Sequence, residues 1–404
     1  MYTPSQKILK NYANVLVNYA LNGGKGIQHG DVVMLICHES AKPLYLELYR
    51  AVLKAGGHVI SSYRPDQHHP YNFEKEFFVN AQDHQIKFFP SKYMKGIVDE
   101  IDHSIYVLSE TDVRALHGVD PQKIMARGES HKPYIEWRNA KEHKGKFTWT
   151  LALYGTEAMA HEAGLSLKEY WNQIIKACFL NEKNPIAKWK SVANQLESYR
   201  LKLNKMKIDK VHVTGSDANL WVTIGKTRNW LGGSGRNIPS FEIFTSPDWR
   251  GTNGWMRFNQ PLYRYGNIVT GIYLEFKNGL VTKATAKKNE ALLKHMIATP
   301  NANKLGEFSM TDRRFSKIDK FMAETLFDEN IGGEYGNSHV ALGASYVDTY
   351  VGNPAKLTKA DKLKLGYNES TVHTDVVTTT PRTITAHWNN GRSKIIYTNG
   401  QYKF

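Results

Sequence analysis

The feature that most constrains the fold is a strand, a helix and a second strand that follow one another within the first 66 residues. The segment GDVVMLICHES contains an apolar run at 32–37 that is typical of a buried strand. PLYLELYRAVLKAGG (43–57) has apolar residues at helical spacing and stops at two glycines. HVISSYRPD (58–66) follows with a second strand pattern. Because parallel strands need a crossover connection, this order predicts a parallel sheet with a right-handed βαβ unit.

The rest of the N-terminal part continues the alternation of helices and strands. An amphipathic helix is predicted near 8–19, so the start of the chain does not have the pattern of a signal peptide. FEKEFFVNAQDH favours a helix, and SIYVLSE (104–110) favours a further strand. Helical patterns then cover 155–180 and 188–206. No GxGxxG follows any predicted strand, so this fold alone does not imply a dinucleotide.

The pattern changes near residue 208, where hairpins replace the alternation. VHVTGSDANLWVTIG indicates a hairpin, and Asn278-Gly279 stands where a tight two-residue turn belongs. TVHTDVVTTT and the segments on either side of Asn390-Gly391 also favour strands. We therefore predict an α/β N-terminal domain with a helical extension (1–185) and a mixed α+β C-terminal domain (186–404). Their boundary is expected somewhere in 181–207.

Composition narrows the classes of function. The 53 Lys and Arg against 38 Asp and Glu give a formal net charge of +15, which admits either a solvated enzyme surface or a nucleic-acid partner. There is no apolar run of about 18 residues, so we expect no membrane span. The two cysteines, Cys37 and Cys178, cannot form a disulfide framework, and we expect a cytoplasmic protein.

Two acidic residues stand in unusual contexts in the C-terminal half. Glu242 lies among apolar residues in RNIPSFEIFTSP, where a buried carboxylate would need a metal or an arginine. The alternative is an alternating strand with Glu242 facing solvent. Glu307 follows a glycine in NANKLGEFSMT, a pair that is also common in loops.

Histidines and further carboxylates follow. Glu334 precedes His339 by five residues in ETLFDENIGGEYGNSHVALG, a segment that also fits a glycine-rich surface turn. On a strand, His373 and Asp375 project to one face, either as two metal ligands, as a histidine oriented by a carboxylate, or as a solvent-facing pair. Neither HExxH nor GxSxG occurs, which excludes a zincin and a nucleophile elbow.

Taken together and in this order, four motifs resemble the thermophilic metalloprotease family of metal-dependent aminopeptidases. They are RNIPSFEIFTSP, KLGEFSMT, TLFDEN…GGEYGNSHVALG and STVHTDVV. The segments QHGDVVMLICHESAKPLYLELYRAVLKAGG and WTLALYGTEAMAHEAGLSLKEYWNQIIKACF are also similar to the family, so the resemblance covers nearly the whole chain. It implies a C-terminal catalytic metal-binding domain and a homodimer.

Carried over by motif, the resemblance implies two divalent ions per chain (Zn²⁺, Co²⁺ or Mn²⁺) and a catalytic tyrosine at Tyr346, seven residues after the loop histidine. The implied metal ligands are Glu242, Glu307, Glu334, His339, His373 and Asp375. The interposed GGEYG leaves Glu329 and Glu334 as alternatives for the loop ligand. Glu334 is preferred because it keeps the five-residue spacing to the histidine. Glu307 or Glu334 would also shuttle a proton.

The chemistry of these residue types agrees with that assignment. Four carboxylates and two neutral histidines balance two divalent ions, and a bridging hydroxide leaves a negative place for the ammonium of a free peptide N-terminus. Tyr346 would hydrogen-bond the tetrahedral oxyanion. We therefore expect an aminopeptidase that acts on peptides with a free N-terminus, with no nucleic-acid or membrane partner. The alternatives are a basic nucleic-acid-binding protein with structural acidic clusters and a two-domain small-molecule-binding protein.

Overall fold

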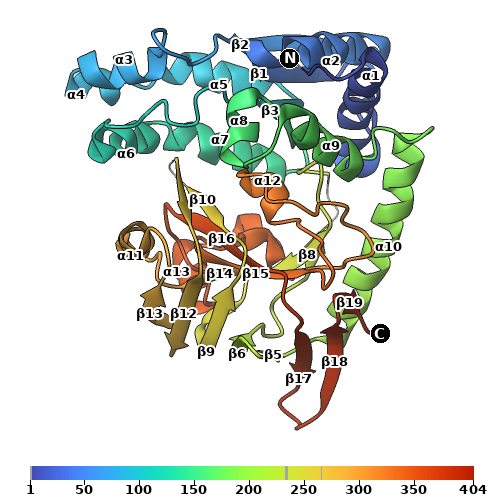
Figure 1. The fold of residues 1–404 in the computed structure, drawn as a ribbon, viewed down its shortest axis with the longest axis vertical. Coiled ribbons are helices and arrows are strands. Elements are labelled where there is room, and N and C mark those ends of the chain that lie inside the picture. Colours follow the sequence, from blue (N-terminus) through green and yellow to red (C-terminus); the bar gives the residue numbers. More distant parts are fainter. Residues whose placement is uncertain (1, 233–234, 265) are drawn as a thin grey trace. The chain divides into compact units, whose positions relative to one another are not determined.

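The computed structural model describes residues 2–232, 235–264 and 266–404 (Figure 1). These residues form two compact units, which divide between Lys188 and Trp189. The first unit also takes in a short segment that ends at Ile238, and the second comprises the remainder up to Phe404. The division falls within the 22-residue helix α10 (Pro185–Met206). The predicted fold class, a parallel-sheet α/β part followed by a mixed α+β part, is confirmed.

The first unit is built on a four-stranded parallel sheet in the order β2-β1-β3-β4. The strands are β1 (Val32–His38), β2 (His58–Arg64), β3 (His103–Leu108) and β4 (Thr148–Leu153). Alternate residues of β1 are buried, and helix α2 (Lys42–Lys54) makes the predicted crossover to β2. The backbone at 236–238 extends the sheet beside β4, because Leu151 N–H donates to Arg236 O at 2.7 Å and Ile238 N–H donates to Leu151 O at 3.0 Å.

Helices complete the first unit. They are α1 (Gln6–Val15), α3 (Phe73–Asn80), α4 (Asp83–Ile86), α5 (Ser91–Glu100), α6 (Pro121–Ser130), α7 (Lys132–His143), α8 (Glu157–Glu162) and α9 (Leu167–Ala177). The helical region predicted at 155–180 contains two helices, α8 and α9, and Gly164 adopts a φ of +69° between them. Helix α9 then starts afresh at a capping box in which Ser166 and Glu169 satisfy each other's backbone N–H groups.

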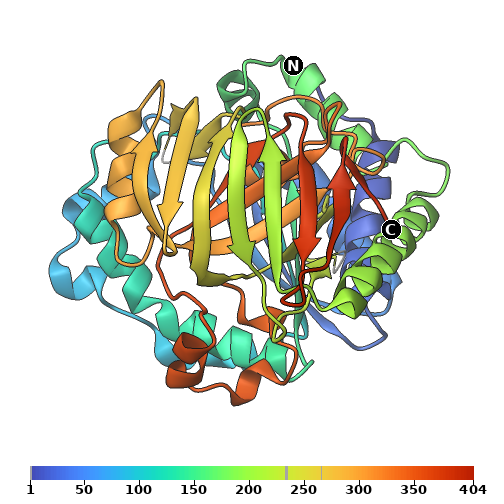
Figure 2. The same ribbon diagram turned by 90° about the horizontal axis from the view of Figure 1, so that it is seen from below.

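The second unit contains two antiparallel sheets. The larger has the order β13-β12-β9-β6-β5-β17-β18-β19 and is seen face-on in Figure 2, with the strands of the smaller sheet behind it. Its strands are β5 (Lys210–Gly215), β6 (Ala218–Thr223), β9 (Asp248–Phe258), β12 (Ile272–Lys277), β13 (Leu280–Thr285), β17 (Thr383–His387), β18 (Ser393–Thr398) and β19 (Gln401–Tyr402). The predicted turn at Asn278-Gly279 is present, and both residues have positive φ, as a type I′ turn requires.

The smaller sheet has five strands in the order β16-β15-β14-β8-β7. They are β7 (Leu231–Gly232), β8 (Glu242–Thr245), β14 (Leu305–Thr311), β15 (Asn337–Gly343) and β16 (His373–Thr378). A short hairpin, β10 (Leu262–Arg264) with β11 (Asn267–Val269), and the helices α11 (Glu290–Ala298), α12 (Thr325–Asp328) and α13 (Lys359–Lys364) lie outside the two sheets.

Both faces of the smaller sheet are covered. Every residue of β14 and of β15 is buried, whichever face it points to. Apolar side chains such as Phe308 and Met310 explain the burial of one face of β14. Acidic and hydroxyl side chains occupy the other face of the same strand, and burial obliges them to find partners within the protein. No helix in the described part of the chain is both long and apolar enough to cross a membrane.

Candidate metal centre

The register of the five-stranded sheet brings the predicted ligands to one face. Glu307 on β14 lies opposite Ala341 on β15, and Ala341 in turn lies opposite Asp375 on β16. His339 is two residues from Ala341 on the same strand, and side chains two apart on a strand share a face. The small Ala341 side chain therefore leaves a space that is bordered by two carboxylates and an imidazole.

The ring of His339 lies at the centre of this space. Its Nε2 atom is 3.2 Å from Glu242 Oε2 and 3.3 Å from Glu307 Oε1, and it lies 3.9 Å from Asp375 Oδ1. Glu242 comes from the neighbouring strand β8, where it is 7% exposed. The alternative in which Glu242 faces solvent is therefore wrong.

His373 borders the same carboxylates from the other side. Its Nε2 atom is 3.8 Å from Glu307 Oε2 and 3.7 Å from Asp375 Oδ1. The donor atoms of Glu242, Glu307 and His339 lie within 4.8 Å of one another, and so do those of Glu307, His373 and Asp375. Glu307 belongs to both groups, which is the arrangement expected of a carboxylate between two cations.

The electrostatics of the cluster favour bound cations. Burial raises the pKa of Glu307 to about 7; the hydrogen bond from His339 lowers it, and the charge of Glu242 raises it. Burial disfavours the charged form of His339, but hydrogen bonds to Glu242 and Glu307 outweigh this and raise its pKa well above the usual value. Within the described residues, no lysine or arginine forms an ion pair with Glu242, Glu307 or Asp375. Oxygen and imidazole donors with excess negative charge fit divalent ions.

For the loop ligand, the sequence spacing and the structure favour different residues. Glu329 follows α12 directly and is 9% exposed. Burial raises its pKa well above the usual value, and the charges of Glu242 and Asp375 raise it further, so its carboxylate faces the cluster. Glu334 is exposed beyond Gly333, where φ is +58°, and it belongs to neither group of converging donors.

The physical reason is that the number of residues between two positions in a loop does not determine the direction in which their side chains point. One helical turn carries Glu329 to the same side as the buried Leu326, three residues earlier, whereas the turn at Gly333 carries Glu334 outward. That i, i+3 relation to an apolar residue is the sequence signal that points to Glu329. The structure thus brings five of the six predicted ligands together, and Glu334 is the one that it leaves outside.

Tyr346 lies beside the cluster, just beyond β15. Its ring packs edge-on against His373 with centroids 4.8 Å apart, and its backbone N–H donates to Ser246 Oγ at 2.8 Å. Burial raises the pKa of its phenol well above the usual value, and the charges of Glu307 and Asp375 act in the same direction. The hydroxyl is therefore protonated at neutral pH and available as a hydrogen-bond donor, although 42% of the residue is exposed.

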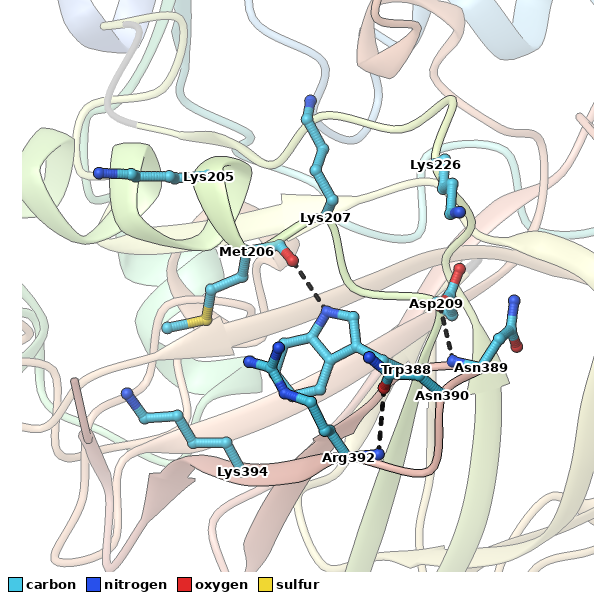
Figure 3. A pocket seen from close by; sticks show the side chains of 10 residues that line it. All are labelled: Lys205, Met206, Lys207, Asp209, Lys226, Trp388, Asn389, Asn390, Arg392 and Lys394. Atoms are coloured by element: carbon cyan, nitrogen blue, oxygen red, sulfur yellow. Dashed lines mark hydrogen bonds between the residues drawn. The ribbon is translucent and has the colours of Figure 1, made fainter.

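A concave region of the second unit shares no residue with the cluster (Figure 3). It has a volume of about 750 Å³ and is lined by Lys205, Met206, Lys207, Asp209, Lys226, Trp388, Asn389, Asn390, Arg392 and Lys394. Asp209 is its one carboxylate, and it already accepts a hydrogen bond from Asn389 N. Figure 3 shows the lysine side chains spread around Trp388 rather than directed to one point. This region has no set of metal donors.

Comparison with known proteins identifies the family and agrees with the fold. A model of the thermophilic metalloprotease (M29) family matches residues 5–402, so the chain belongs to this family. The predicted class of enzyme, a metal-dependent peptide hydrolase, is thereby confirmed. Membership also confirms the resemblance that the four motifs carry.

Individual relatives span the chain. Aminopeptidase PepS of Streptococcus thermophilus is 28% identical over 420 residues, which is 98% of this chain and 97% of the relative. Aminopeptidase T of Thermus thermophilus is 29% identical over 66% of this chain and 68% of its own length. The solved structure of wild-type AmpT from Thermus thermophilus superposes with a TM-score of 0.82 at 21% identity, and covers 99% of this chain and 100% of that one. At this identity the superposition shows a shared fold.

Proposed function

We propose that this protein is a two-metal aminopeptidase that removes N-terminal residues from peptides. The observation that carries the proposal is the position of Glu307, whose carboxylate belongs to two overlapping groups of buried donors. Family membership and relatives that are named aminopeptidases support the choice of peptides as substrates.

The proposed ligands revise the set that the motifs imply. One group is Glu242, Glu307 and His339, and the other is Glu307, His373 and Asp375. Glu329 takes the place of Glu334 as the loop ligand, because its carboxylate faces these groups from a buried position. Four carboxylates then match the charge of two divalent ions, with Zn²⁺, Co²⁺ and Mn²⁺ all suited to mixed oxygen and nitrogen donors.

When bound, such ions would polarise the scissile carbonyl and acidify the attacking water. The chain's own residues supply the remaining functions. The carboxylates of Glu242, Glu307, Glu329 and Asp375 would balance the charge of the two ions, so that the hydroxide form of the attacking water would leave a net negative charge that attracts the ammonium of a free peptide N-terminus. The Tyr346 hydroxyl, which stays protonated because its pKa is raised, donates a hydrogen bond to the oxyanion that forms at the carbonyl. Glu307, whose carboxylate belongs to both groups of donors, would accept the proton that the water loses.

Two measurements test the proposal. Metal analysis of the purified chain should give about two divalent ions per chain, and their removal by a chelator should abolish hydrolysis of an aminoacyl chromogenic amide. The same amide with an acetylated N-terminus should not be cleaved, because acetylation removes the ammonium. Equal hydrolysis of the acetylated compound would refute the exopeptidase, and an active chain without metal would refute the metal mechanism.

A homodimer and a cytoplasmic location belong to the same proposal. They come from the resemblance to the family and from the absence of a disulfide framework in the sequence. Light scattering on the purified chain, over a range of concentrations, tests the homodimer directly, and a monomer at all concentrations would contradict it.

A further inference from the structure

We propose that three buried neutral side chains, Ser309, Asn330 and Asn337, are positioning residues for the metal centre. Each forms a contact with a different proposed ligand, and none of them carries a charge. All three are at most 2% exposed. The inference rests on the proposed function and extends it beyond the ligands to the groups that hold them in place.

Asn337 orients the imidazole of His339. Its side-chain Nδ2 donates to the backbone oxygens of Glu329 and Ile331, each at 2.8 Å, which fixes the orientation of the amide. Its Oδ1 therefore faces His339 Nδ1 at 3.3 Å, and an amide oxygen can only accept. The neutral ring, which is the form that binds an ion, must then carry its hydrogen on Nδ1. In that form the Nε2 lone pair is directed at the space between Glu242 and Glu307, where an ion would bind.

Asn330 connects the loop carboxylate to the strand that carries another ligand. Its Oδ1 accepts a hydrogen bond from the backbone N–H of Phe241 at 2.7 Å, one residue before Glu242. Its Nδ2 donates to Glu329 Oε1 at 3.2 Å and to Leu326 O at 3.2 Å. A single buried amide thus holds the Glu329 carboxylate in register with β8.

Ser309 completes the set on strand β14. Its hydroxyl donates to Glu242 Oε2 at 2.7 Å, and it lies two residues after Glu307, on the same face of the strand. His373 has a comparable partner from the backbone, because its Nδ1 lies 2.9 Å from Ala344 O. In this way Glu242, Glu329 and both histidines each contact a neutral hydrogen-bonding group in addition to their contacts with one another.

The neutrality of these partners matters for an ion. A lysine or arginine at these positions would neutralise the carboxylates and compete with a cation, and another carboxylate would add to the repulsion within the cluster. An amide or hydroxyl fixes the orientation of the ligand without neutralising the carboxylates and without adding repulsion. Because the ligands are held before an ion arrives, less side-chain freedom is lost on binding, and such partners typically change metal affinity 10- to 100-fold.

Metal titration of single variants tests this inference. Chelator-treated Asn337→Ala, Asn330→Ala and Ser309→Ala proteins are titrated with Zn²⁺ in competition with a chromophoric chelator. We expect each variant to bind Zn²⁺ about 10- to 100-fold more weakly than the wild type. Melting temperatures in chelator show whether the metal-free fold is retained.

The matched control is Asn204→Ala. Asn204 also makes two hydrogen bonds to backbone groups, accepting from Trp230 N at 2.6 Å and donating to Trp230 O at 3.0 Å, but it contacts no proposed ligand. Its variant should keep wild-type affinity. The inference is overturned if the three variants bind Zn²⁺ as the wild type does, or if Asn204→Ala weakens binding as much as they do.

Two further outcomes are decisive. If an asparagine variant does not fold, Ser309→Ala decides the matter, since it removes a single oxygen atom from the core, and unchanged Zn²⁺ affinity in that variant would overturn the inference. If the wild type binds no divalent ion, the proposed function fails as well. Tight binding by wild type and variants alike would contradict only the positioning role.

Discussion

At the scale of single residues, the cluster depends on which carboxylate has which neighbour. Glu307 is shared by two groups of donors, Tyr346 borders them through His373, and Glu329 reaches them from a loop. These three residues have different proposed roles, and substitutions at each of them should therefore change different measurements.

Glu329 and Glu334 form a matched pair for the loop ligand. We expect Glu329→Gln to weaken metal binding at least tenfold and to lower activity accordingly, because it removes a buried donor charge. Glu334→Gln should stay within about twofold of the wild type, since Glu334 is exposed. Metal content and kcat/KM of the two variants, measured side by side, decide between them, and the opposite order would restore Glu334.

Tyr346→Phe removes a hydroxyl without removing a metal ligand. We expect kcat to fall about 100-fold, the typical effect of losing one donor to an oxyanion, while the metal content and KM stay near the wild-type values. Steady-state kinetics together with metal analysis check this. An unchanged kcat would show that the ring serves only to pack against His373.

The pH dependence of the metal-free protein follows from Glu307, whose pKa is raised by burial to about 7. An acid with a raised pKa in the folded state binds more protons there than when unfolded, so this group stabilises the fold less as pH rises from about 4.5 to about 7. Metal binding needs the deprotonated form, so metal affinity should increase over the same pH range.

Glu307→Gln provides the control for this pH effect. Thermal melts in chelator between pH 5 and pH 8 should show a steeper loss of stability in the wild type than in the variant. The variant should also bind less metal at every pH. Parallel stability curves for the two proteins would contradict the pH assignment to Glu307.

At the scale of elements, strand β14 contains a local irregularity next to the site. Leu305 pairs with Leu342 and Glu307 pairs with Ala341, so Gly306 is an extra residue in the ladder, a β-bulge. Bulges commonly redirect a neighbouring side chain beside an active site. A Cβ atom on Gly306 would lie 2.1 Å from Ala344 O, so the backbone approaches too closely for any other residue.

Gly306→Ala should therefore disturb both the strand and the position of Glu307. We expect a loss of about 1–3 kcal/mol in the free energy of unfolding and weaker metal binding. The control is Gly96→Ala in helix α5, where a Cβ would meet nothing within 4 Å and alanine favours the helix. Denaturant unfolding of both variants measures the two effects. An unchanged free energy of unfolding for Gly306→Ala would show that the bulge can relax to accept a methyl group.

At the scale of the whole molecule, a basic protein contains a buried acidic centre. The formal charge is +15, yet the candidate site is a cluster of carboxylates, and it shares no residue with the region around Trp388 that several lysines line. If the protein instead binds nucleic acid, its affinity for nucleic acid should fall steeply as the salt concentration rises. The net charge thus describes the surface more than the site.

Metal binding to the folded state should stabilise the whole chain by mass action. At a metal concentration about 1,000 times Kd, the gain is about 4 kcal/mol, so chelation should lower the melting temperature and added Zn²⁺, Co²⁺ or Mn²⁺ should restore it. Calorimetry of the wild type with and without chelator measures the shift. The Glu307→Gln variant should show a smaller shift in melting temperature. Equal shifts in the two proteins would show that the stabilising ions bind outside this centre.

Several features of the fold and of the candidate site can be predicted from the sequence alone. Apolar periodicity and turn residues predict the βαβ unit, the hairpin at Asn278-Gly279 and the change of architecture near residue 208, because these features arise from contacts between residues close in the chain. Ordered motifs identify the family and the residue types of the site. The position of His373 and Asp375 on one face is also a local feature, because side chains two residues apart on a strand point to the same side.

The tertiary structure decided what depends on residues far apart in the chain. Burial of Glu242, the shared position of Glu307 and the contrast between buried Glu329 and exposed Glu334 all arise from sheet register and from the direction in which a loop leaves α12. The contacts of Asn330 with Glu329 and of Asn337 with His339 cannot be predicted from the sequence for the same reason. A sequence specifies which side chains are present and their local spacing, whereas a metal centre forms where strands separated by dozens of residues come into contact.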